Sequence, residues 1–326
     1  MTTKEAVLQA LRSCSGQYIS GEELSTQLNV SRTSIWKAIK ALREEGHTIE
    51  AATNNGYMLI HNNRRLTESE IRHGLSENNR NIEIYVYDSV TSTNSEAKRL
   101  ALEGAADGTL VVSGQQTAGR GRLGRSFYSP KEGIYLSVII RPRFDVSKSV
   151  LITCAAAVAV AESVKEIAGK DARIKWVNDV YVDDRKVCGI LTEGITDFES
   201  GQIEAVIIGI GVNTDVSNFP DDLKRIAGAV DGDYSASELA GAIASRTIDY
   251  AHTIEERTFI DSYRSMSTVI GKKITVYKGQ YKVNPEDEIE GVTAEVKNID
   301  NDGRLIVVYE DGTEEALSSG EISIRL

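Results

Sequence analysis

The first 65 residues alternate between apolar and polar positions in a way that predicts three short helices and a hairpin. Ser20 and Glu23 have the spacing of a capping box at the start of the second helix, and Asn55-Gly56 is a strong hairpin-turn signal. The short turn between the second and third helices is typical of a helix-turn-helix. We therefore predict a winged helix-turn-helix domain over residues 1–65. Its predicted helices are 3–13, 21–28 and 32–45, and its predicted strands are 49–51 and 57–60.

Residues 66–80 are mostly polar, and we predict a linker there that contains a short helix at 68–75. The body that follows, residues 81–268, mixes strand-like alternation with helical spacing, and Thr93 and Glu96 repeat the capping-box spacing. Several predicted strands lie too close together for helical crossovers, so we expect a largely antiparallel sheet and an α+β domain. The predicted strands are 82–86, 110–113, 134–140, 173–176, 180–183, 187–193 and 203–210, and the predicted helices are 93–104, 148–167 and 236–263.

Residues 269–326 differ in kind, because short alternating segments follow one another with Asp-Gly turns at 302–303 and 311–312. About five strands in so short a tail predict a small β-barrel. The chain is therefore expected to be a multidomain α+β protein.

Composition places the chain among ordinary globular proteins, with 41% hydrophobic and 26% charged residues in a length of 326. Its longest apolar run, 150–161, is too short to span a bilayer, and no export leader is visible. We therefore expect a cytoplasmic protein with no membrane partner. The three cysteines, Cys14, Cys154 and Cys188, are far apart, which suits a reducing compartment, and the four histidines show no metal-ligand spacing.

Charge is distributed unevenly along the chain. The first 65 residues hold eight Lys/Arg and six Asp/Glu and are mildly basic, whereas the whole chain has a net charge of −11. If the protein binds nucleic acid, we therefore expect the N-terminal part to bind it. The third predicted helix opens with polar and basic side chains, where a recognition helix meets base edges. A helical protein-interaction module is the alternative. The predicted DNA-contacting residues are Ser31, Arg32, Thr33, Ser34, Trp36, Lys37 and Lys40.

The stretch 118–130, AGRGRLGRSFYSP, contains the letters of the dinucleotide fingerprint G-x-G-x-x-G. That fingerprint must follow a strand directly and open a helix, because the pyrophosphate sits on the amino end of the helix. Here Gly114–Thr117 separates the loop from the preceding strand, and a proline and a strand follow it. We predict instead a loop whose amides and arginines bind phosphates or carboxylates, with a disordered surface turn as the alternative. The arginines are Arg120, Arg122 and Arg125.

A second cluster is predicted from two segments, 175–179 and 184–191, which form a plausible hairpin. The hairpin would bring Asn178, Asp179 and Lys186 into one neighbourhood. Together with a cationic loop, a lysine and a carboxylate suit the attack of a substrate carboxylate on the α-phosphate of a nucleotide, which needs no covalent nucleophile on the protein. The alternative is that these are ordinary polar residues of a hairpin.

Five motifs occur in order along the chain, at residues 88–94, 116–122, 175–179, 186–191 and 209–213. Together they resemble the biotin protein ligases. With the winged helix in front and the barrel behind, the chain resembles the bifunctional type, which also acts as the biotin operon repressor. The resemblance implies a class II synthetase-like central domain and an SH3-like C-terminal barrel.

The resemblance also implies a reaction and partners. Biotin and Mg-ATP would form biotinyl-5′-adenylate, and biotin would then pass to a lysine of the biotin carboxyl carrier domain of acetyl-CoA carboxylase. A homodimer formed through the central sheet would bind operator DNA upstream of biotin genes and repress the biotin synthesis and transport operons. Asp179 would serve Mg²⁺ indirectly, through ATP. The family usually has proline where this chain has Val177, so we expect a difference in local rigidity.

Residue roles carry over by motif. The residues implied to bind biotin are Ser92, Thr93, Asn94, Gln116, Arg120, Gly121, Arg122, Lys186, Gly189 and Leu191. Those implied to bind ATP or the adenylate are Arg120, Arg122, Arg125, Phe127, Lys175, Asn178, Asp179, Asn213 and Arg325. Those implied to be catalytic are Arg120, Arg122, Lys186 and Asp179. Among them, Phe127 is expected to stack on adenine and Arg325 to reach back from the barrel.

Two other functions stay open. A lipoate or octanoate transferase shares the body fold, but we expect it to lack the glycine-arginine loop and the DNA-binding head. A ligand-sensing repressor that has lost catalysis would not need Lys186 or the loop, and both are present.

Overall fold

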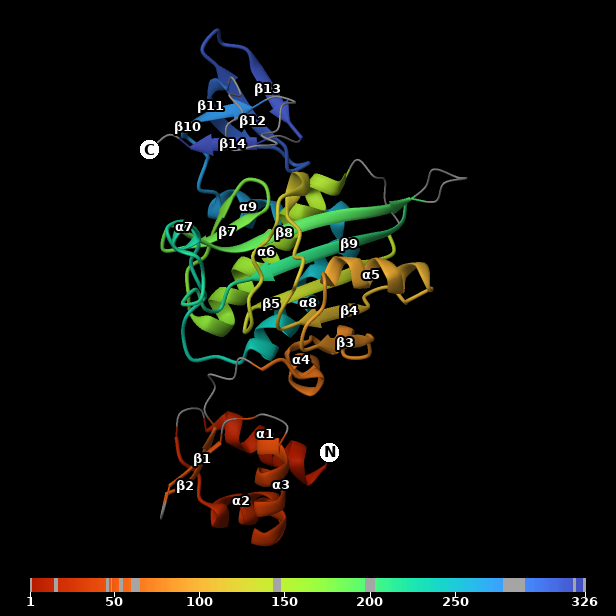
Figure 1. Ribbon diagram of the computed structural model, residues 1–326, viewed down its shortest axis with the longest axis vertical. Helices are drawn as coiled ribbons and strands as arrows, with labels where there is room; N and C mark the ends of the chain where they lie inside the picture. Colours follow the sequence, from red (N-terminus) through yellow and green to blue (C-terminus); the bar gives the residue numbers. More distant parts are fainter. Residues whose placement is uncertain are drawn as a thin grey trace.

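The computed structural model describes residues 2–14, 17–44, 47, 49–52, 55–59, 65–142, 148–196, 203–277, 291–318 and 321–324. Three parts follow one another along the long axis (Figure 1): an N-terminal domain, a central domain and a C-terminal domain. Predicted element ends at residues 45 and 60 lie outside the described residues.

The N-terminal domain is a winged helix-turn-helix with an apolar core of its own. Ser20 Oγ accepts a hydrogen bond from Glu23 N (3.0 Å) and Glu23 Oε2 accepts one from Ser20 N (2.8 Å), which confirms the capping box. Asn29 takes a left-handed conformation (φ 51°) where the second helix ends. Antiparallel pairing of Ile49 with Leu59 forms the hairpin. The elements are α1 (Thr3–Ser13), α2 (Gly21–Leu28), α3 (Arg32–Glu44), β1 (Ile49–Ala52) and β2 (Gly56–Leu59).

The central domain is built on a seven-stranded sheet with the order β3-β4-β5-β9-β8-β7-β6. Only the β3–β4 pair among its described strands is parallel, which confirms the expectation of a largely antiparallel sheet. The strands are β3 (Ile84–Tyr87), β4 (Leu110–Ser113), β5 (Ile134–Ile140), β6 (Arg173–Lys175), β7 (Asp179–Val182), β8 (Arg185–Thr196) and β9 (Ile203–Val212).

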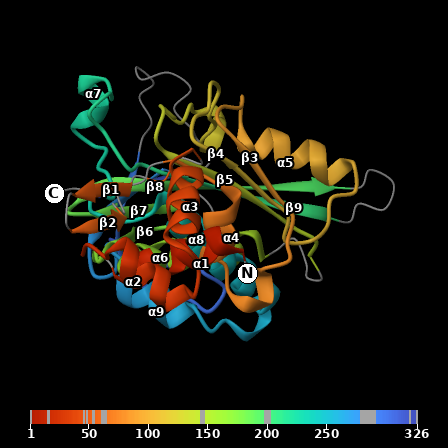
Figure 2. The same ribbon diagram turned by 90° about the horizontal axis from the view of Figure 1, so that it is seen from below.

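Helices cover both faces of this sheet (Figures 1 and 2). Because side chains alternate along a strand, Leu110 and Val112 join one apolar cluster, with α6 (Ser149–Ala168) and α8 (Ala236–His252). Val111 joins a second cluster on the opposite face, with α5 (Thr93–Leu102). α6 is apolar almost all round because it lies buried inside the domain. Among the described residues, no helix has both the length and the apolar character that crossing a membrane requires.

The short helix predicted within residues 66–80 is confirmed, but the stretch packs against the central domain and is not a free linker. It forms α4 (Glu68–Gly74) and the 3₁₀ turn η1 (Glu77–Asn79), and α4 packs against α8. Ile71 and Leu75 are buried in the main core of the central domain. Asn79 Nδ2 donates to Ser245 Oγ (2.9 Å). The polar composition therefore reflects one exposed helix face and a set of specific hydrogen bonds to the central domain, whereas a free linker would have neither.

Two helix predictions also need correction. The long helix predicted at 236–263 is interrupted: α8 ends at His252, and the 3₁₀ turn η4 (Ile254–Glu256) and α9 (Ile260–Met266) follow. Arg257 between them has a φ of 54°, a left-handed conformation that ends a helix. At the start of α5 the cap is Ser92 and not Thr93, since Ser92 Oγ accepts from Ser95 N (3.5 Å). The short helix α7 (Asp221–Lys224) lies between β9 and α8.

The C-terminal domain is a five-stranded antiparallel sheet with the order β13-β12-β11-β10-β14. Its buried face is formed by residues such as Ile274, Val296 and Val307. The strand number agrees with the prediction, and residues 278–290 lie outside the described chain. The strands are β10 (Lys273–Tyr277), β11 (Val292–Ile299), β12 (Leu305–Tyr309), β13 (Glu314–Leu317) and β14 (Glu321–Ile324).

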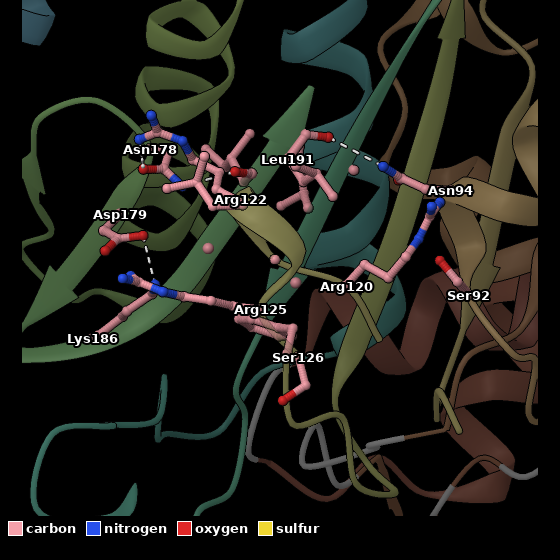
Figure 3. A pocket seen from close by; sticks show the side chains of 18 of the residues that line it. Ser92, Asn94, Arg120, Arg122, Arg125, Ser126, Asn178, Asp179, Lys186 and Leu191 are labelled. Atoms are coloured by element: carbon pink, nitrogen blue, oxygen red, sulfur yellow. Dashed lines mark hydrogen bonds and ion pairs between the residues drawn. The ribbon is translucent and has the colours of Figure 1, made fainter. Parts of the chain in front are cut away.

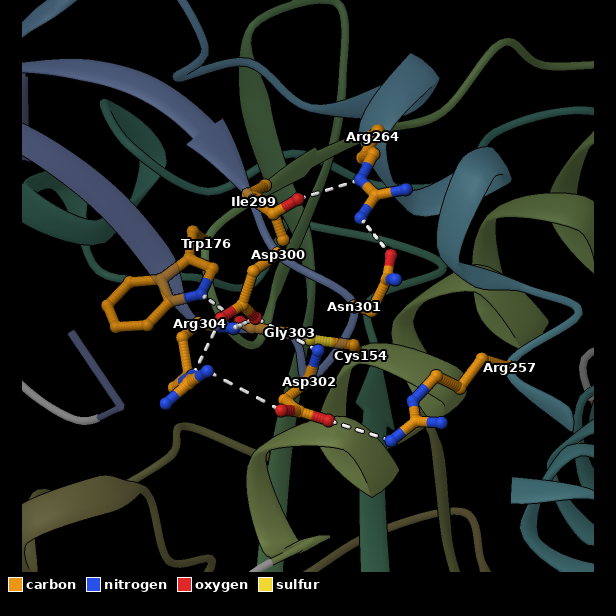
Figure 4. A network of polar contacts seen from close by, with 10 residues as sticks. All are labelled: Cys154, Trp176, Arg257, Arg264, Ile299, Asp300, Asn301, Asp302, Gly303 and Arg304. Atoms are coloured by element: carbon orange, nitrogen blue, oxygen red, sulfur yellow. Dashed lines mark hydrogen bonds and ion pairs between the residues drawn. The ribbon is translucent and has the colours of Figure 1, made fainter. Parts of the chain in front are cut away.

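The turn between β11 and β12 joins the C-terminal domain to the central one (Figure 4). The Gly303 carbonyl accepts a hydrogen bond from Trp176 Nε1 (2.9 Å), and Arg264 Nε donates to the Ile299 carbonyl (2.7 Å). Asp302 forms an ion pair with Arg257 (2.9 Å). The predicted Asp-Gly turn is therefore also a contact with the segment 175–179.

Candidate active site

A cavity of about 310 Å³ lies where the start of α5, the glycine-arginine loop and strands β7, β8 and β9 meet (Figure 3). It brings together residues from all five sequence motifs. The predicted site residues that line it are Ser92, Thr93, Asn94, Gln116, Arg120, Gly121, Arg122, Arg125, Phe127, Lys175, Asn178, Asp179, Lys186, Gly189 and Leu191. Lining residues that were not predicted as site residues are Leu123, Ser126, Trp176, Ile190, Gly209, Ile210 and Gly211. Two predicted residues are not in it: Asn213 lines an adjoining cavity of about 1050 Å³, and Arg325 lies outside the described residues.

One end of the cavity is formed by the β7–β8 hairpin. Pairing of Asp179 with Gly189 places Lys186 on the same side, and Lys186 Nζ lies 2.6 Å from Asp179 Oδ1. Asn178 Nδ2 donates to the Ile190 carbonyl (2.9 Å). The predicted hairpin is confirmed, and it sets a partly buried lysine and carboxylate against each other (Figure 3).

The other end of the cavity contains a network of neutral polar groups. Gln116 Oε1 accepts from the Thr93 amide (2.8 Å), and Thr93 Oγ1 and Asn94 Oδ1 both contact Ser137 Oγ, at 2.8 and 2.6 Å. Because Asn94 Oδ1 can only accept, the Ser137 hydroxyl donates to it. The network fixes the positions of groups that could hydrogen-bond a polar ring system.

Two glycines of β9 make room for the side chains that shape the cavity. A Cβ at Gly209 would lie 2.0 Å from Asn94 Oδ1, and a Cβ at Gly211 would lie 2.5 Å from Cε1 of Phe127. Phe127 also packs edge-on against Tyr135, with ring centroids 6.5 Å apart. The small residues of the motif at 209–213 are thus explained by close approach of other elements.

The glycine-arginine loop is held by short-range contacts and contains no α-helix. The Gly121 amide donates to the Arg125 carbonyl (2.7 Å), and the only helical element is the 3₁₀ turn η2 (Arg122–Gly124) in this fully described stretch. β5 follows at Ile134. The expectation that the loop does not open a dinucleotide-binding helix is confirmed. Arg122 Nη1 reaches across the cavity to Asn178 Oδ1 (3.2 Å).

Among the described residues, the cavity lining contains no cysteine and no histidine. The two cysteines of the central domain are unsuited to nucleophilic attack, because burial raises the pKa of Cys154 to about 12 and raises that of Cys188 well above its ordinary range. At the adjoining cavity, burial raises the pKa of Tyr181 to about 12. The lining therefore offers cations, amides, hydroxyls and one carboxylate, a set that suits positioning and charge stabilisation.

Three polar residues beside this site were missed by sequence reasoning: Ser137, Lys98 and Glu193. Ser137 lies in the all-buried strand β5, and Glu193 on β8 receives hydrogen bonds from Lys98 and Asn94. A signal for Glu193 did exist. The two-residue period of a strand puts positions 189, 191 and 193 on one face.

In the N-terminal domain, the predicted DNA-contacting residues lie on the outer side of α3. Ile35, Ile39 and Leu42 are buried on its inner side. Ser31 caps the helix, since its Oγ accepts from the Ser34 amide (3.1 Å). Trp36 is 54% exposed. The predicted residues other than the half-buried Ser34 are exposed: Ser31, Arg32, Thr33, Trp36, Lys37 and Lys40.

Family comparisons agree with this architecture. The Biotin/lipoate A/B protein ligase family matches residues 85–213, an HTH domain matches residues 3–58, and the Biotin protein ligase C terminal domain matches residues 283–325. The chain also has the fold of the biotin protein ligase from Aquifex aeolicus solved with biotin and ATP. That structure has a TM-score of 0.61 and 24% identity, over 74% of this chain and 98% of the other.

Curated relatives resemble the chain more closely. The bifunctional ligase/repressor BirA of Bacillus subtilis is 40% identical over 229 residues, which are 69% of this chain and 70% of the relative. BirA of Escherichia coli is 26% identical over 95% of this chain and 94% of its own length. The biotin–[acetyl-CoA-carboxylase] ligase of Paracoccus denitrificans is 36% identical over 43% of this chain and 55% of its own length. The chain therefore belongs to the biotin protein ligase family, in its group of bifunctional ligase/repressors.

Proposed function

We propose that the chain activates biotin with ATP to biotinyl-5′-adenylate and transfers biotin to a lysine of the biotin carboxyl carrier domain of acetyl-CoA carboxylase. The observation that carries the proposal is a single cavity that joins three kinds of groups: a polar network, a loop of arginines and a Lys–Asp pair. Such a cavity suits a substrate with a neutral polar ring and a carboxylate that reacts with a nucleotide.

In the first step, an oxygen of the biotin carboxylate attacks the α-phosphorus of ATP, and the bond to pyrophosphate breaks. Both reactants are anions, so their approach needs cations. Arg120, Arg122 and Lys186 line the cavity and would offset this charge, most strongly as the charge gathers in the transition state. In the second step, the amine of the acceptor lysine attacks the acyl carbon and AMP leaves. Asp179 would accept the proton or orient the amine.

Mg²⁺ fits this site as a partner of ATP. The described residues contain no group of three or more His, Cys, Asp or Glu side chains that could hold a metal ion by themselves. Mg²⁺ is commonly bound through one or two carboxylates together with substrate phosphates, and Asp179 is the carboxylate that lines the cavity. Bound in this way, Mg²⁺ would neutralise phosphate charge.

We extend the proposal to repression. The adenylate-bound form would dimerise through the central sheet, in which β3 is an edge strand in the order of the described strands. Two winged helices would then bind operator DNA upstream of biotin genes. The exposed polar and basic side chains of α3 support this reading. The setting we propose is the cytoplasm, where ATP and the carboxylase are available.

Two alternatives are weaker. A lipoate or octanoate transferase is in the scope of the matched family, but the DNA-binding head and the arginine loop favour the biotin ligase. A non-catalytic ligand-sensing repressor is disfavoured by the Lys186–Asp179 ion pair in the cavity. Such a repressor would not need the pair.

The decisive experiment supplies labelled biotin, Mg-ATP and a carrier domain to the purified protein and measures covalent transfer. We expect transfer that depends on all three components. Formation of a lipoyl adenylate without a biotinyl adenylate would overturn the assignment. Binding of biotin without any adenylate would support the non-catalytic repressor. A biotin-dependent mobility shift on operator DNA, with sedimentation of the protein with and without biotin, tests repression and dimerisation.

A further inference from the structure

Glu193 is a partly buried carboxylate beside the cavity that receives three donors. Its side chain is 20% exposed and projects from β8. Lys98 Nζ lies 2.6 Å from Oε1, while Asn94 Nδ2 (2.7 Å) and Arg120 Nη2 (3.2 Å) both donate to Oε2. One carboxylate therefore forms ion pairs with two cations. The cluster carries a surplus positive charge next to the site proposed for an anionic substrate.

The two cations hold Glu193 unequally. Lys98 projects from α5 and makes a short contact, whereas Arg120 projects from the loop and makes a single, longer one. Arg120 is also the more exposed of the two, at 42% against 30%. A guanidinium can give a carboxylate or phosphate two parallel hydrogen bonds, which is a stronger arrangement than its contact here. Arg120 is therefore the partner that an anionic ligand can most easily withdraw.

The carboxylate keeps a cationic partner when Arg120 leaves. Burial alone would raise the pKa of Glu193, but hydrogen bonds from Lys98 and Asn94 and the charges of Lys98 and Arg120 lower it below its ordinary value. Lys98 remains as a counter-ion at 2.6 Å, so the withdrawal of Arg120 leaves no unpaired buried charge.

Glu193 also fixes the wall of the cavity. The Asn94 amide donates to Glu193, and its oxygen accepts from Ser137 (2.6 Å). Figure 3 shows the Arg120 guanidinium beside this amide. Loss of Glu193 therefore has an effect through Asn94 that is independent of Arg120, and an experiment has to separate the two.

We propose that Glu193 is a positioning residue that holds Arg120 at the edge of the cavity through their ion pair. When the substrate binds, Arg120 leaves Glu193 and binds the carboxylate or phosphate of the substrate, while Lys98 remains as the counter-ion of Glu193. The inference rests on the proposed function, which supplies the anionic substrate. Glu193 then competes with biotin for Arg120. Removal of the Glu193 charge strengthens biotin binding through Arg120. Removal of the Lys98 charge weakens it, because Arg120 becomes the only cation of Glu193.

The test is calorimetric titration of biotin into the full chain carrying Glu193→Gln or Lys98→Met, each in the wild-type background and in an Arg120→Ala background. Effects through Asn94 or on folding occur in both backgrounds and cancel in their ratio. We expect Glu193→Gln to raise biotin affinity by about two- to fivefold more with Arg120 than without it, the range of an exposed ion pair. Lys98→Met is expected to lower biotin affinity, and to lower it more with Arg120 than without it.

The directions in which Glu193→Gln and Lys98→Met change biotin affinity decide the outcome. Local damage would move both substitutions in the same direction, whereas competition for Arg120 moves them in opposite directions. Equal effects of Glu193→Gln in the two backgrounds, or a larger loss of affinity when Arg120 is present, would overturn the inference and leave the proposed function intact. A wild-type chain that binds no biotin would overturn the proposed function as well.

Discussion

The N-terminal domain and the active site of the central domain place their functional residues in opposite ways. The candidate DNA-contacting residues occupy one short segment, Ser31 to Lys40, and a single helix presents them. The cavity is lined by residues between Ser92 and Gly211, which lie on several strands, at the start of a helix and in a loop. A recognition surface can thus be local in sequence, whereas a reactive cavity is assembled by pairing distant strands.

The two regions also have separate apolar cores. The core of the N-terminal domain includes Leu24 and Leu42, and no residue of it belongs to the core around α6 and α8. The regions meet at a buried contact, in which His47 Nδ1 lies 2.7 Å from Glu70 Oε1. Because the two apolar cores are separate, we expect substitutions in one region to leave the folding of the other largely intact. The following experiments test this separation.

The largest effect is expected at Lys186. Lys186→Met removes the cation of the Lys186–Asp179 pair, and loss of one such charge in a preorganised site typically costs about 10²–10³ in rate. Single-turnover formation of biotinyl-adenylate measures the effect. Lys165→Met, at an exposed position near the end of α6, is the control and should keep the wild-type rate. Equal rates in both variants would remove Lys186 from the chemistry.

Leu24→Ala tests the N-terminal core. Leu24 is fully buried, and truncation of a buried leucine costs about 2–5 kcal/mol of stability. We expect the N-terminal domain to unfold at lower temperature and operator binding to weaken, with adenylate formation unchanged. Leu102→Ala, at a position 69% exposed, is the matched control. Loss of adenylate formation in Leu24→Ala would show that the two regions are coupled.

Gly209→Ala tests the close approach of α5 to the sheet. The new Cβ would lie 2.0 Å from Asn94 Oδ1, so the Asn94 amide must leave its place between Ser137 and Glu193. A buried polar group without its partner costs about 1–3 kcal/mol, so we expect biotin affinity to fall by about tenfold. Gly194→Ala on β8 is the control, since its nearest neighbour is Ile203 Cδ1 at an ordinary 3.6 Å. The explanation fails if both variants bind biotin alike.

The smallest effect is expected at Lys37. Lys37→Ala removes one exposed cation from α3, so operator affinity should fall by a few-fold and the slope of log K against log salt should decrease by about 1. Lys297→Ala on the exposed C-terminal sheet is the control and should leave the slope unchanged. A loss of affinity without a change in slope would mean that Lys37 does not contact phosphate.

Local features of the sequence were enough to determine many element boundaries. The predicted bounds of α1, α2, β4 and β5 agree with the structure at both ends. The capping box at Ser20 and Glu23 and the period of the apolar positions act over a few residues, so they can be recognised without knowledge of the rest of the fold. The lining residues among the candidates were found because five ordered motifs resemble a known family, and a single motif would have been ambiguous.

Other features were decided only by tertiary structure. The stretch at 66–80 looks like a linker in sequence, but α8 gives Ile71 and Leu75 an apolar surface on which to bury. The ion pairs of Arg257 with Asp302 and of Lys98 with Glu193 depend likewise on partners far away in the chain. The physical reason is that burial and ion pairing are properties of distance in space, whereas the period and the caps of an element are properties of neighbours in sequence. The sequence alone therefore determined most of the elements, the family and the charged groups, and the fold determined which of those groups meet.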